Sequence, residues 1–354
     1  MRHIYKSFIL LLAIVLLSSC EKVIDFDTQS QNEKGIAVYA LAIPGKQFTA
    51  RISRSFTVNE NPQAIFSPAG NDYGEVLDSI FYSQVVIKDA SAEILVNGVE
   101  QYNLYYRDED PFYYTCDYVP KAGDKISLTI KAKGYDDVSA TVTVENPQPV
   151  EIVKTEVVFK DNGIDMPDEF ADQIPDYGAA SSSFSENPFD QYGMDSVMLI
   201  TLRFNDPGAQ RNFYRLKVRA IADRKRRIMG DNYRYFYSVS EIFSSSDVVF
   251  IDNLLVKPFS GWDAGFSDVF DDHLFDGTSH TFTVETRKRY GNNPRVDVEL
   301  QTISQDLYYF LKSYQLFRMS TDDVYMTPIG LHSNIANGWG IFGTLSYDRH
   351  IIFY

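Results

Sequence analysis

The densest set of oxygen and nitrogen ligands in the sequence lies in one short stretch, DDHLFDG, at residues 271–277. It holds Asp271, Asp272, His273 and Asp276, followed by a glycine. Hard cations such as Ca²⁺ take carboxylate oxygens from tight turns, so a metal site is one interpretation. The EF-hand spacing and its closing Glu are missing, however, and Asp-Gly is ordinary turn chemistry. We therefore favour a structural turn and predict no bound metal.

Sequence patterns that carry catalysis are missing from the rest of the chain. There is no Gly-x-Ser-x-Gly elbow, no His-Glu-x-x-His and no glycine-rich phosphate loop. Beyond residue 20, no histidine stands beside a second His or a Cys at ligand spacing; these histidines are His273, His280, His332 and His350. We predict a protein that is not an enzyme and that carries no cofactor.

The residue with the clearest chemical role is Cys20. Basic residues precede an uncharged apolar run at residues 8–17, which is the pattern of a secretory signal. This run is too short to cross a hydrocarbon core, which takes about 20 residues in a helix. The stretch LSSC at residues 17–20 resembles a bacterial lipobox, in which the chain is cut before a cysteine that carries lipid on its sulfur. We predict a signal peptide at residues 1–19 and lipid attachment at Cys20, with an unlipidated secreted protein as the alternative.

Several acyl chains on one cysteine hold a protein stably at a membrane, because each buried methylene contributes about 0.8 kcal/mol. Residues 20–34 are polar after the cysteine and lack a sustained period, so we predict a lipid anchor and tether there. Since Cys20 is lipidated in this interpretation, Cys116 has no partner for a disulfide. The same two cysteines cannot form a Cys-based zinc site.

Net charge argues against nucleic acid as a partner. The chain carries −15, and removal of residues 1–19, with Arg2 and Lys6, makes this −17. Such a chain is repelled by nucleic acid and by anionic headgroups. The basic run at residues 224–227 precedes a turn, and we interpret it as a solvated hairpin tip.

Clustered tyrosines are the remaining candidates for a ligand surface. They lie in QYNLYYRDEDPFYYTC and NYRYFY, and the candidates are Tyr105, Tyr106, Tyr233, Tyr235 and Tyr237. Exposed tyrosines suit binding surfaces, where they stack on sugar rings or grip a peptide. Aromatic strands more often pack in a core, and that interpretation is the favoured one.

Most of the chain has the pattern of β-structure. In DKISLTIKAKGYDDVSATVTV, residues 124–144, apolar side chains alternate with polar ones on both sides of a Gly-containing turn, which predicts a β-hairpin. The sequence NPQP at residues 146–149 interrupts pairing, because Pro cannot donate to a ladder. We predict a β-sandwich of immunoglobulin-like or transthyretin-like type at residues 35–146.

A second β-rich domain is predicted for residues 147–354. Strand patterns occur in DSVMLITLRFND, NFYRLKVRAI and HTFTVETRKR. Residues 161–195 differ from them, with nine acidic residues and no Lys or Arg. Long stretches of this kind are either functional or disordered; a plain mobile loop is favoured over a binding loop that orders on a partner.

One helix is predicted in the second domain, at about residues 304–318. Apolar side chains fall at helical spacing, at Leu307, Phe310, Leu311 and Tyr314. Ser304 is in the position of an N-cap. The amphipathic pattern predicts that the helix packs on a sheet.

Several of these stretches together resemble one family. CEKVIDFD after the lipobox, GDKISLTIKAKGY running into VSATVTVENP, and FNDPGAQRNFYRLKVR are similar to the DUF4249 lipoproteins of Bacteroidota. DDHLFDG, VELQTISQDLYYFLKS and SNIANGWGIFGTLS match further stretches, so the resemblance spans nearly the whole chain after Cys20. It implies an outer-membrane or cell-surface lipoprotein that serves a TonB-dependent receptor in nutrient uptake.

Two serines also match a modification pattern of that phylum. Asp78-Ser79-Ile80 and Asp195-Ser196-Val197 resemble its Asp-Ser/Thr-apolar O-glycosylation sequence. Sugar at Ser79 or Ser196 is therefore a hypothesis.

We expect a non-enzymatic, lipid-anchored outer-membrane or cell-surface lipoprotein that is an accessory or binding partner of a TonB-dependent transporter in nutrient uptake. Its mechanism would be capture or gating through sandwich loops and aromatic surface. A stand-alone surface adhesin or glycan-binding lipoprotein is the alternative.

Overall fold

The computed structural model describes residues 35–55, 85–107, 113–161, 194–208, 210–229, 232–240, 243–250, 266–289, 292–322 and 330–354. Cys20, the tether, Ser79 and residues 162–193 of the acidic segment lie outside these ranges. The described chain is mainly β, as predicted. No helix in the described ranges has the length and apolar character needed to span a membrane.

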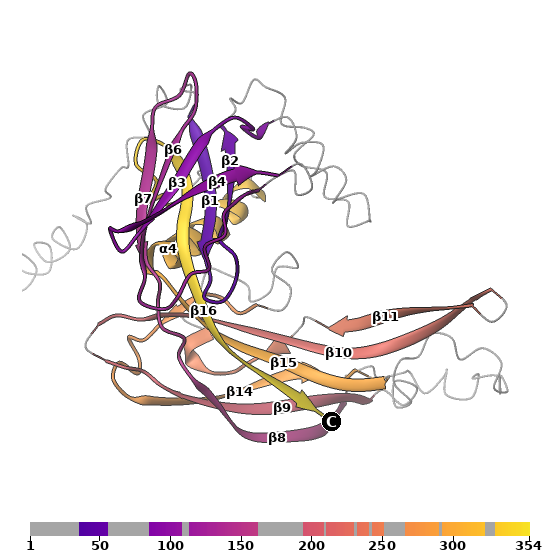
Figure 1. Ribbon diagram of the computed structural model, residues 1–354. Helices are drawn as coiled ribbons and strands as arrows, with labels where there is room; N and C mark the ends of the chain where they lie inside the picture. The colour runs from indigo at the N-terminus through magenta and orange to yellow at the C-terminus, as the bar shows by residue number, and fades with distance from the viewer. Residues whose placement is uncertain are drawn as a thin grey trace, which may run out of the picture.

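Two β-rich lobes are joined at an angle (Figure 1). The upper lobe holds β1 (Ile36–Ala42), β2 (Thr49–Arg54), β3 (Ser91–Val96), β4 (Glu100–Tyr106), β5 (Tyr114–Thr115), β6 (Lys125–Lys131) and β7 (Val138–Thr143). The lower lobe holds β8 (Val150–Asp161), β9 (Met194–Asn205), β10 (Phe213–Met229), β11 (Asn232–Ser240), β12 (Phe243–Ser244), η4 (Val248–Phe250), β13 (Phe270–Asp271), β14 (Ser279–Arg287) and β15 (Asn292–Ile303). Helix α4 (Gln305–Asp322) lies beside the upper lobe, and β16 (Trp339–Phe353) runs through both lobes.

The hairpin predicted from the alternating pattern is confirmed as β6 and β7. Ile126 faces Val142 and Ile130 faces Val138 across the pair, and these apolar side chains are buried. The turn between the strands contains Gly134 with a φ of 87°, a value that an L side chain rarely adopts.

The sheet of the upper lobe curls until its ends meet. Its strands follow the order β16-β1-β2-β5-β4-β3-β6-β7. At the closing point, Ala336 N donates to Ser139 O at 2.8 Å, and Ser139 N donates to Ala336 O at 3.3 Å. The apolar faces of all these strands surround one core, whose largest fully buried side chains include Phe48 and Tyr114.

The lower lobe is a sandwich of two sheets. One layer follows the order β11-β10-β15-β16, and the other follows β12-β14-β9-β8. The three strands predicted in this half are confirmed as β9, β10 and β14. On β10, the alternate residues Tyr214, Leu216 and Val218 all face the core between the layers.

β16 joins the two lobes. The predicted division into two domains near residue 146 did not include a strand shared by both. Its first half pairs in parallel with β1, from Trp339 opposite Ala37 to Thr344 opposite Ala42. Its second half pairs antiparallel with β15. Phe342 packs edge-to-face on Phe48, with ring centroids 5.7 Å apart. Residues 339–344 therefore complete the curled sheet of the upper lobe, where a sandwich confined to residues 35–146 was predicted, and they add one parallel pair to it.

The predicted helix is confirmed as α4. Tyr308 N donates to Ser304 O at 2.9 Å, so Ser304 has the expected position before the helix. Its hydroxyl accepts from Thr344 N of β16 at 3.1 Å, which fastens the start of the helix to this strand. A Cβ on Gly343 would lie 2.9 Å from Leu307 Cβ, so glycine permits the close packing of α4 on β16.

Candidate functional site

The stretch DDHLFDG forms a turn at the lobe junction, as predicted. Its first residue, Asp271, pairs with Phe213 at the end of β13. The chain then folds back twice, because Phe275 N donates to Asp272 O at 2.8 Å and Thr278 N donates to Phe275 O at 2.9 Å.

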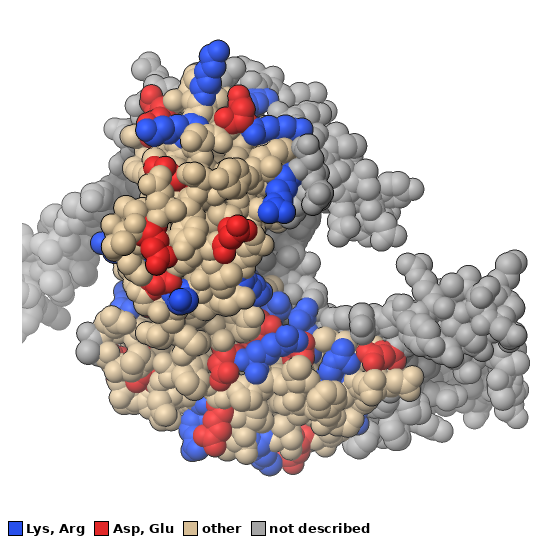
Figure 2. All heavy atoms as spheres, in the orientation of Figure 1, with Lys and Arg blue, Asp and Glu red and all other residues tan. Residues whose placement is uncertain are grey.

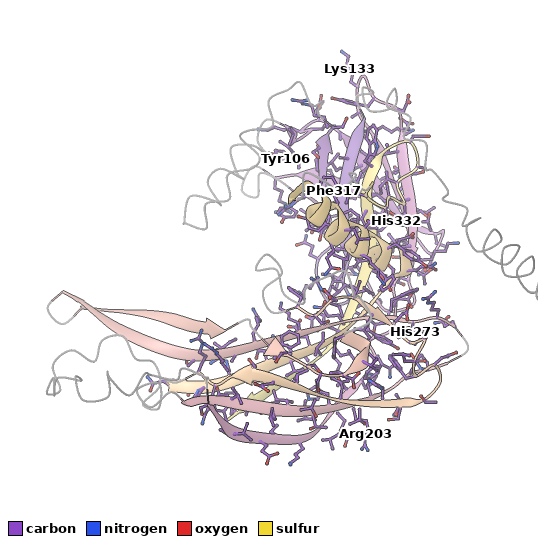
Figure 3. The ribbon with its side chains drawn as sticks, turned by 180° about the vertical axis from the view of Figure 1, so that it is seen from behind. Tyr106, Lys133, Arg203, His273, Phe317 and His332 are labelled. Atoms are coloured by element: carbon purple, nitrogen blue, oxygen red, sulfur yellow. The ribbon has the colours of Figure 1, made fainter. Side chains whose placement is uncertain are left out.

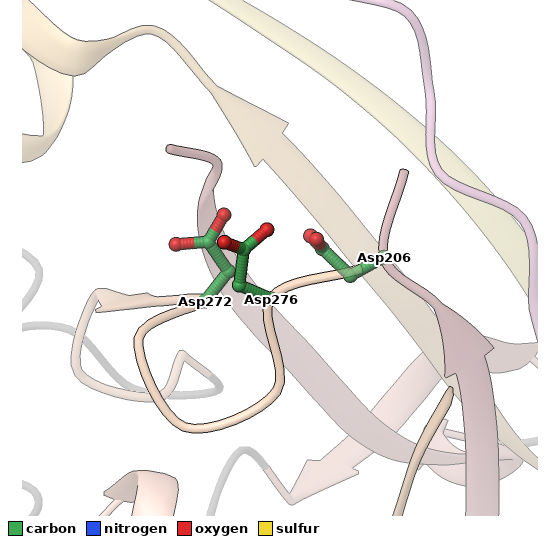
Figure 4. A group of neighbouring side chains, drawn as sticks. All are labelled: Asp206, Asp272 and Asp276. Carbon is green, nitrogen blue, oxygen red and sulfur yellow. The ribbon is translucent and has the colours of Figure 1, made fainter. Parts of the chain in front are cut away.

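Three carboxylates converge beside this turn (Figure 4). Asp206, Asp272 and Asp276 each offer one ligand atom, and these atoms all lie within 4.8 Å of one another. The first two are buried and Asp276 is exposed. The sequence analysis placed Asp272 and Asp276 together but missed Asp206, which comes from the end of β9. Its Asp-Pro-Gly turn was visible in the sequence, but nothing there placed it against the second turn.

Asp206 accepts hydrogen bonds at both oxygens. Oδ1 accepts from the Tyr214 hydroxyl at 2.6 Å and from Asn212 Nδ2 at 3.3 Å. Oδ2 accepts from Gly208 N at 3.0 Å and from Gly277 N at 2.9 Å. A carboxylate offers about four lone-pair positions. The protein therefore uses the full acceptor capacity of Asp206 and leaves no free position for a cation.

The two glycines explain how the turns approach so closely. Gly208 and Gly277 both have positive φ values, of 64° and 67°. A Cβ on Gly208 would lie 2.8 Å from the Cα of Gly277. Asp206 therefore fastens two glycine turns face to face, which is a structural role.

Asp272 is the carboxyl group of the cluster whose pKa is raised. It accepts from Asn212 N at 2.6 Å and from Asn212 Nδ2 at 3.3 Å. Burial raises the pKa of the Asp272 carboxyl, and the charges of Asp206 and Asp276 raise it further. Protonation of Asp272 is therefore a way to relieve the repulsion among the three carboxylates without a metal ion.

Asp271 faces the opposite way and connects the turn to α4. Arg211 Nη2 and His273 Nδ1 both contact its carboxylate. Burial by itself would raise the pKa of the Asp271 carboxyl. The hydrogen bonds from His273 and Arg211 outweigh this effect, so the pKa lies below its ordinary value. The Tyr308 hydroxyl of α4 lies 3.5 Å from the same carboxylate. Figure 3 places His273 at this junction, below the helix.

A second charged cluster lies on β15 and its neighbours. Asp297, 3 % exposed, accepts from Arg349 Nη2 of β16 at 2.7 Å and from Arg219 Nη2 of β10 at 3.4 Å. Glu299 lies 3.7 Å from Arg349 Nε and 4.0 Å from Lys217 Nζ. Figure 2 shows basic and acidic side chains gathered together where the lobes meet. These pairs bind three strands of the sheet to one another.

The predicted tyrosine surface is divided between the lobes. Tyr105 on β4 is 64 % exposed. Its neighbour Tyr106 is half-buried against Tyr114, with ring centroids 5.6 Å apart, and Lys88 Nζ lies 5.7 Å from its ring centre. Tyr105 is therefore open to a ligand, whereas Tyr106 supports the core.

The other three tyrosines lie at alternate positions of β11. Tyr233, Tyr235 and Tyr237 lie opposite Arg227, Lys225 and Asp223 of β10, at every second position of the strand. Their side chains lie outside the described part of the structure. The strand confirms that the basic run at residues 224–227 is next to a hairpin turn, since Met229 pairs with Asn232.

Ser196, the second proposed glycosylation residue, lies in β9 and is 4 % exposed. Its backbone oxygen accepts from Lys288 N at 3.0 Å. A sugar on this hydroxyl has no room in the folded chain. Ser79 and Cys20 lie outside the described residues, and Cys116 is a buried free cysteine.

Comparisons with known proteins give one match. The family model described as a domain of unknown function, DUF4249, matches residues 21–351. Searches of curated proteins and of solved structures found no match. The family match begins directly after Cys20 and covers both lobes, α4 and most of β16. The chain belongs to the DUF4249 family.

Proposed function

We propose that this chain is a non-enzymatic lipoprotein of Bacteroidota, anchored in the outer membrane and exposed at the cell surface, where it binds a TonB-dependent transporter and assists nutrient uptake. The observation that carries the proposal is the lipobox LSSC at residues 17–20, placed directly before the family match. The resemblance to lipoproteins encoded beside TonB-dependent receptors supplies the partner.

Two buried acids of the structure are engaged in contacts within the chain itself. Asp206 is saturated by four donors of the chain itself, and Asp297 is held between two arginines. Acids committed in this way are poor proton donors and acceptors for a substrate. Such a protein would bind a partner through its surface and its shape.

A tether at residues 20–34 would allow a weak contact between this chain and the transporter to be sufficient. Residues 20–34 span at most about 50 Å when fully extended. A body held so close to a membrane meets a transporter in the same membrane at a high effective concentration. The contact between the two proteins then needs only moderate intrinsic affinity.

The test is a pull-down from native membranes in mild detergent. The lipidated chain with a C-terminal tag is compared with a Cys20→Ala variant, and the bound proteins are identified by mass spectrometry. We expect a stoichiometric TonB-dependent receptor with the wild-type chain and none with the variant. An acyl mass on Cys20 and loss of residues 1–19, read from intact-mass spectra, establish the anchor itself.

Recovery of the chain alone would contradict the transporter proposal. The alternative, a stand-alone adhesin or glycan-binding lipoprotein, would then be the better explanation, and Tyr105 is the exposed aromatic side chain to examine first. That alternative expects the purified chain to bind glycans without any transporter.

A further inference from the structure

The lower half of β16 has an open backbone edge. At the two ends of its pairing with β15, Ser304 N donates to Thr344 O at 3.1 Å and Tyr354 N donates to Pro294 O at 3.3 Å. In an antiparallel ladder every second residue bonds to the neighbouring strand. Because the register between these ends has no shift, the even-numbered residues bond to β15. Arg349, Ile351 and Phe353 therefore point their N–H and C=O groups to the other side.

No described strand covers that other side below the lobe junction. β1 occupies it only as far as Thr344. The connection between the lobes then touches β16 through side chains, since Ser346 Oγ contacts Glu145 O and Asp348 Oδ2 accepts from Val150 N at 2.9 Å. The open stretch is therefore residues 349–353, which we call the β16 edge.

The β16 edge lacks the protection found on the neighbouring edge strand. β8 ends the second layer on the same side of the sandwich, and it has a register shift between Ile152 and Lys154. It also carries an ion pair of 2.7 Å between Lys154 and Glu156. Bulges and charges of this kind keep other strands from adding to an edge. The β16 edge has a regular register, its Arg349 is paired with Asp297 of β15, and residues 351–353 carry no charge.

The β16 edge also exposes two large apolar side chains. Ile351 is 47 % exposed and Phe353 is 68 % exposed. They alternate with Ile352, which packs against the core of the sandwich, so both lie on one outer face. A strand added at this edge would pair the open backbone groups and place its own side chains beside Ile351 and Phe353.

We infer that the β16 edge binds an extended segment of the partner protein as an added β-strand, with apolar residues of that segment beside Ile351 and Phe353. This mode of recognition takes its affinity from backbone hydrogen bonds and its selectivity from alternate side chains. The inference rests on the proposed function for the partner, a TonB-dependent transporter, and it names the surface that the transporter occupies.

A second copy of the chain fits the β16 edge less well. Two edges paired antiparallel are related by a two-fold axis perpendicular to the sheet, which also brings the β8 strands of the copies together. Each mature copy carries −17, so two copies brought together along this edge repel each other.

The first test is site-specific photo-crosslinking in native membranes. A photoreactive phenylalanine replaces Ile351 or Phe353, one at a time, in the full lipidated chain. We expect both to crosslink to one segment of one protein, at positions two residues apart. Crosslinks that are scattered, that reach only a second copy, or that do not form would each overturn the inference.

The second test removes single backbone N–H groups with proline and repeats the pull-down from native membranes. Ile351→Pro removes an N–H that faces the open side, whereas Ile352→Pro removes one that bonds to β15. We expect Ile351→Pro to fold, as shown by an unchanged Tm, and to lose the partner. Ile352→Pro serves as the control for a damaged ladder and should lower the Tm.

A side-chain variant covers the case in which Ile351→Pro does not fold. Phe353→Ser should lose the partner, while Val157→Ser, at an exposed position on β8, should keep it. If both β16 variants retain the transporter, the inference is wrong and the proposed function stands. If the crosslinked segment belongs to another class of protein, the strand addition stands and the transporter proposal is wrong.

Discussion

The hydroxyl of Tyr214 donates a hydrogen bond of 2.6 Å to Asp206 inside the lower lobe, where Tyr214 is 1 % exposed and Asp206 is 5 % exposed. Burial raises the pKa of the Tyr214 hydroxyl, and its hydrogen bond to Asp206 raises it further. The phenol therefore stays protonated and keeps its donor for Asp206. The same carboxylate also holds the Gly208 and Gly277 turns, so this pair joins the core of the sandwich to the lobe junction.

Tyr214→Phe should destabilise the chain by about 1–3 kcal/mol, because a buried carboxylate oxygen loses a donor that water cannot replace. Urea unfolding of the purified chain measures the difference. Tyr102→Phe is the matched control, since Tyr102 also donates to a carboxylate, Glu100, but at the surface. Equal effects of the two substitutions would contradict the assigned role of Asp206.

Asp272→Asn should stabilise the chain at about pH 7. The folded pKa of Asp272 lies above its value of about 3.9 in an unfolded chain, so the unfolded state accepts the anion more readily. Ionised Asp272 therefore destabilises the fold above the folded pKa, and this effect disappears below the unfolded pKa. Urea unfolding near pH 7 and near pH 3 should show a gain at the higher pH and none at the lower. A gain of equal size at both values would exclude charge as its cause.

Calcium should not change the thermal stability. Asp206 already accepts four hydrogen bonds from the chain, so one of the three carboxylates has no free position for Ca²⁺, which takes about 6–8 oxygen ligands. Thermal unfolding in millimolar Ca²⁺ and in EDTA should give the same Tm. A higher Tm in Ca²⁺ that is lost in Asp276→Asn would replace the structural interpretation with a metal site.

Gly340→Ala should destabilise the chain by about 3 kcal/mol or more. A Cβ at this position would lie 2.0 Å from Val38 O, and the φ of 101° disfavours an L side chain. Gly98→Ala is the control, because Gly98 also has a positive φ but has no atom within 4 Å of the added Cβ. Gly98→Ala should lower the free energy of unfolding only by the ~1–2 kcal/mol of left-handed backbone strain. Similar losses for both glycines would mean that β1 and β16 separate easily.

A fragment of residues 35–146 should not fold alone. Without β16, the apolar β1 becomes an edge, and Phe48 loses its ring contact with Phe342. Circular dichroism and proton NMR should show a disordered fragment, and a peptide of residues 333–346 added in excess should restore dispersed signals. A cooperative unfolding transition of the fragment alone would contradict the role assigned to β16.

Local patterns in the sequence were sufficient for most elements. The alternation in residues 124–144 predicted β6 and β7, and the helical spacing from Leu307 to Tyr314 predicted α4. The turn at DDHLFDG followed from its Asp-Gly chemistry. In each case neighbouring residues decide the structure, because the periodicity itself determines which face is buried.

Long-range pairings were missed. The alternation in β16 predicts a strand, but it does not reveal that half of the strand completes the sheet of the other lobe. Asp206 was missed for the same reason, since its partner Gly277 lies in a distant turn. The prediction placed Ser304 correctly before the start of α4. Its hydroxyl, however, accepts a hydrogen bond from Thr344 N of β16. A single sequence carries no direct signal for contacts between residues so far apart.

The pairing of β1 with β16 also sets an order of assembly. β1 is synthesised long before residues 339–344, so its second neighbour is missing for most of the time that synthesis takes. Until then its apolar edge is open to wrong strands, and such edges promote aggregation. The upper lobe, although made first, is therefore completed only after residues 339–344 have been made.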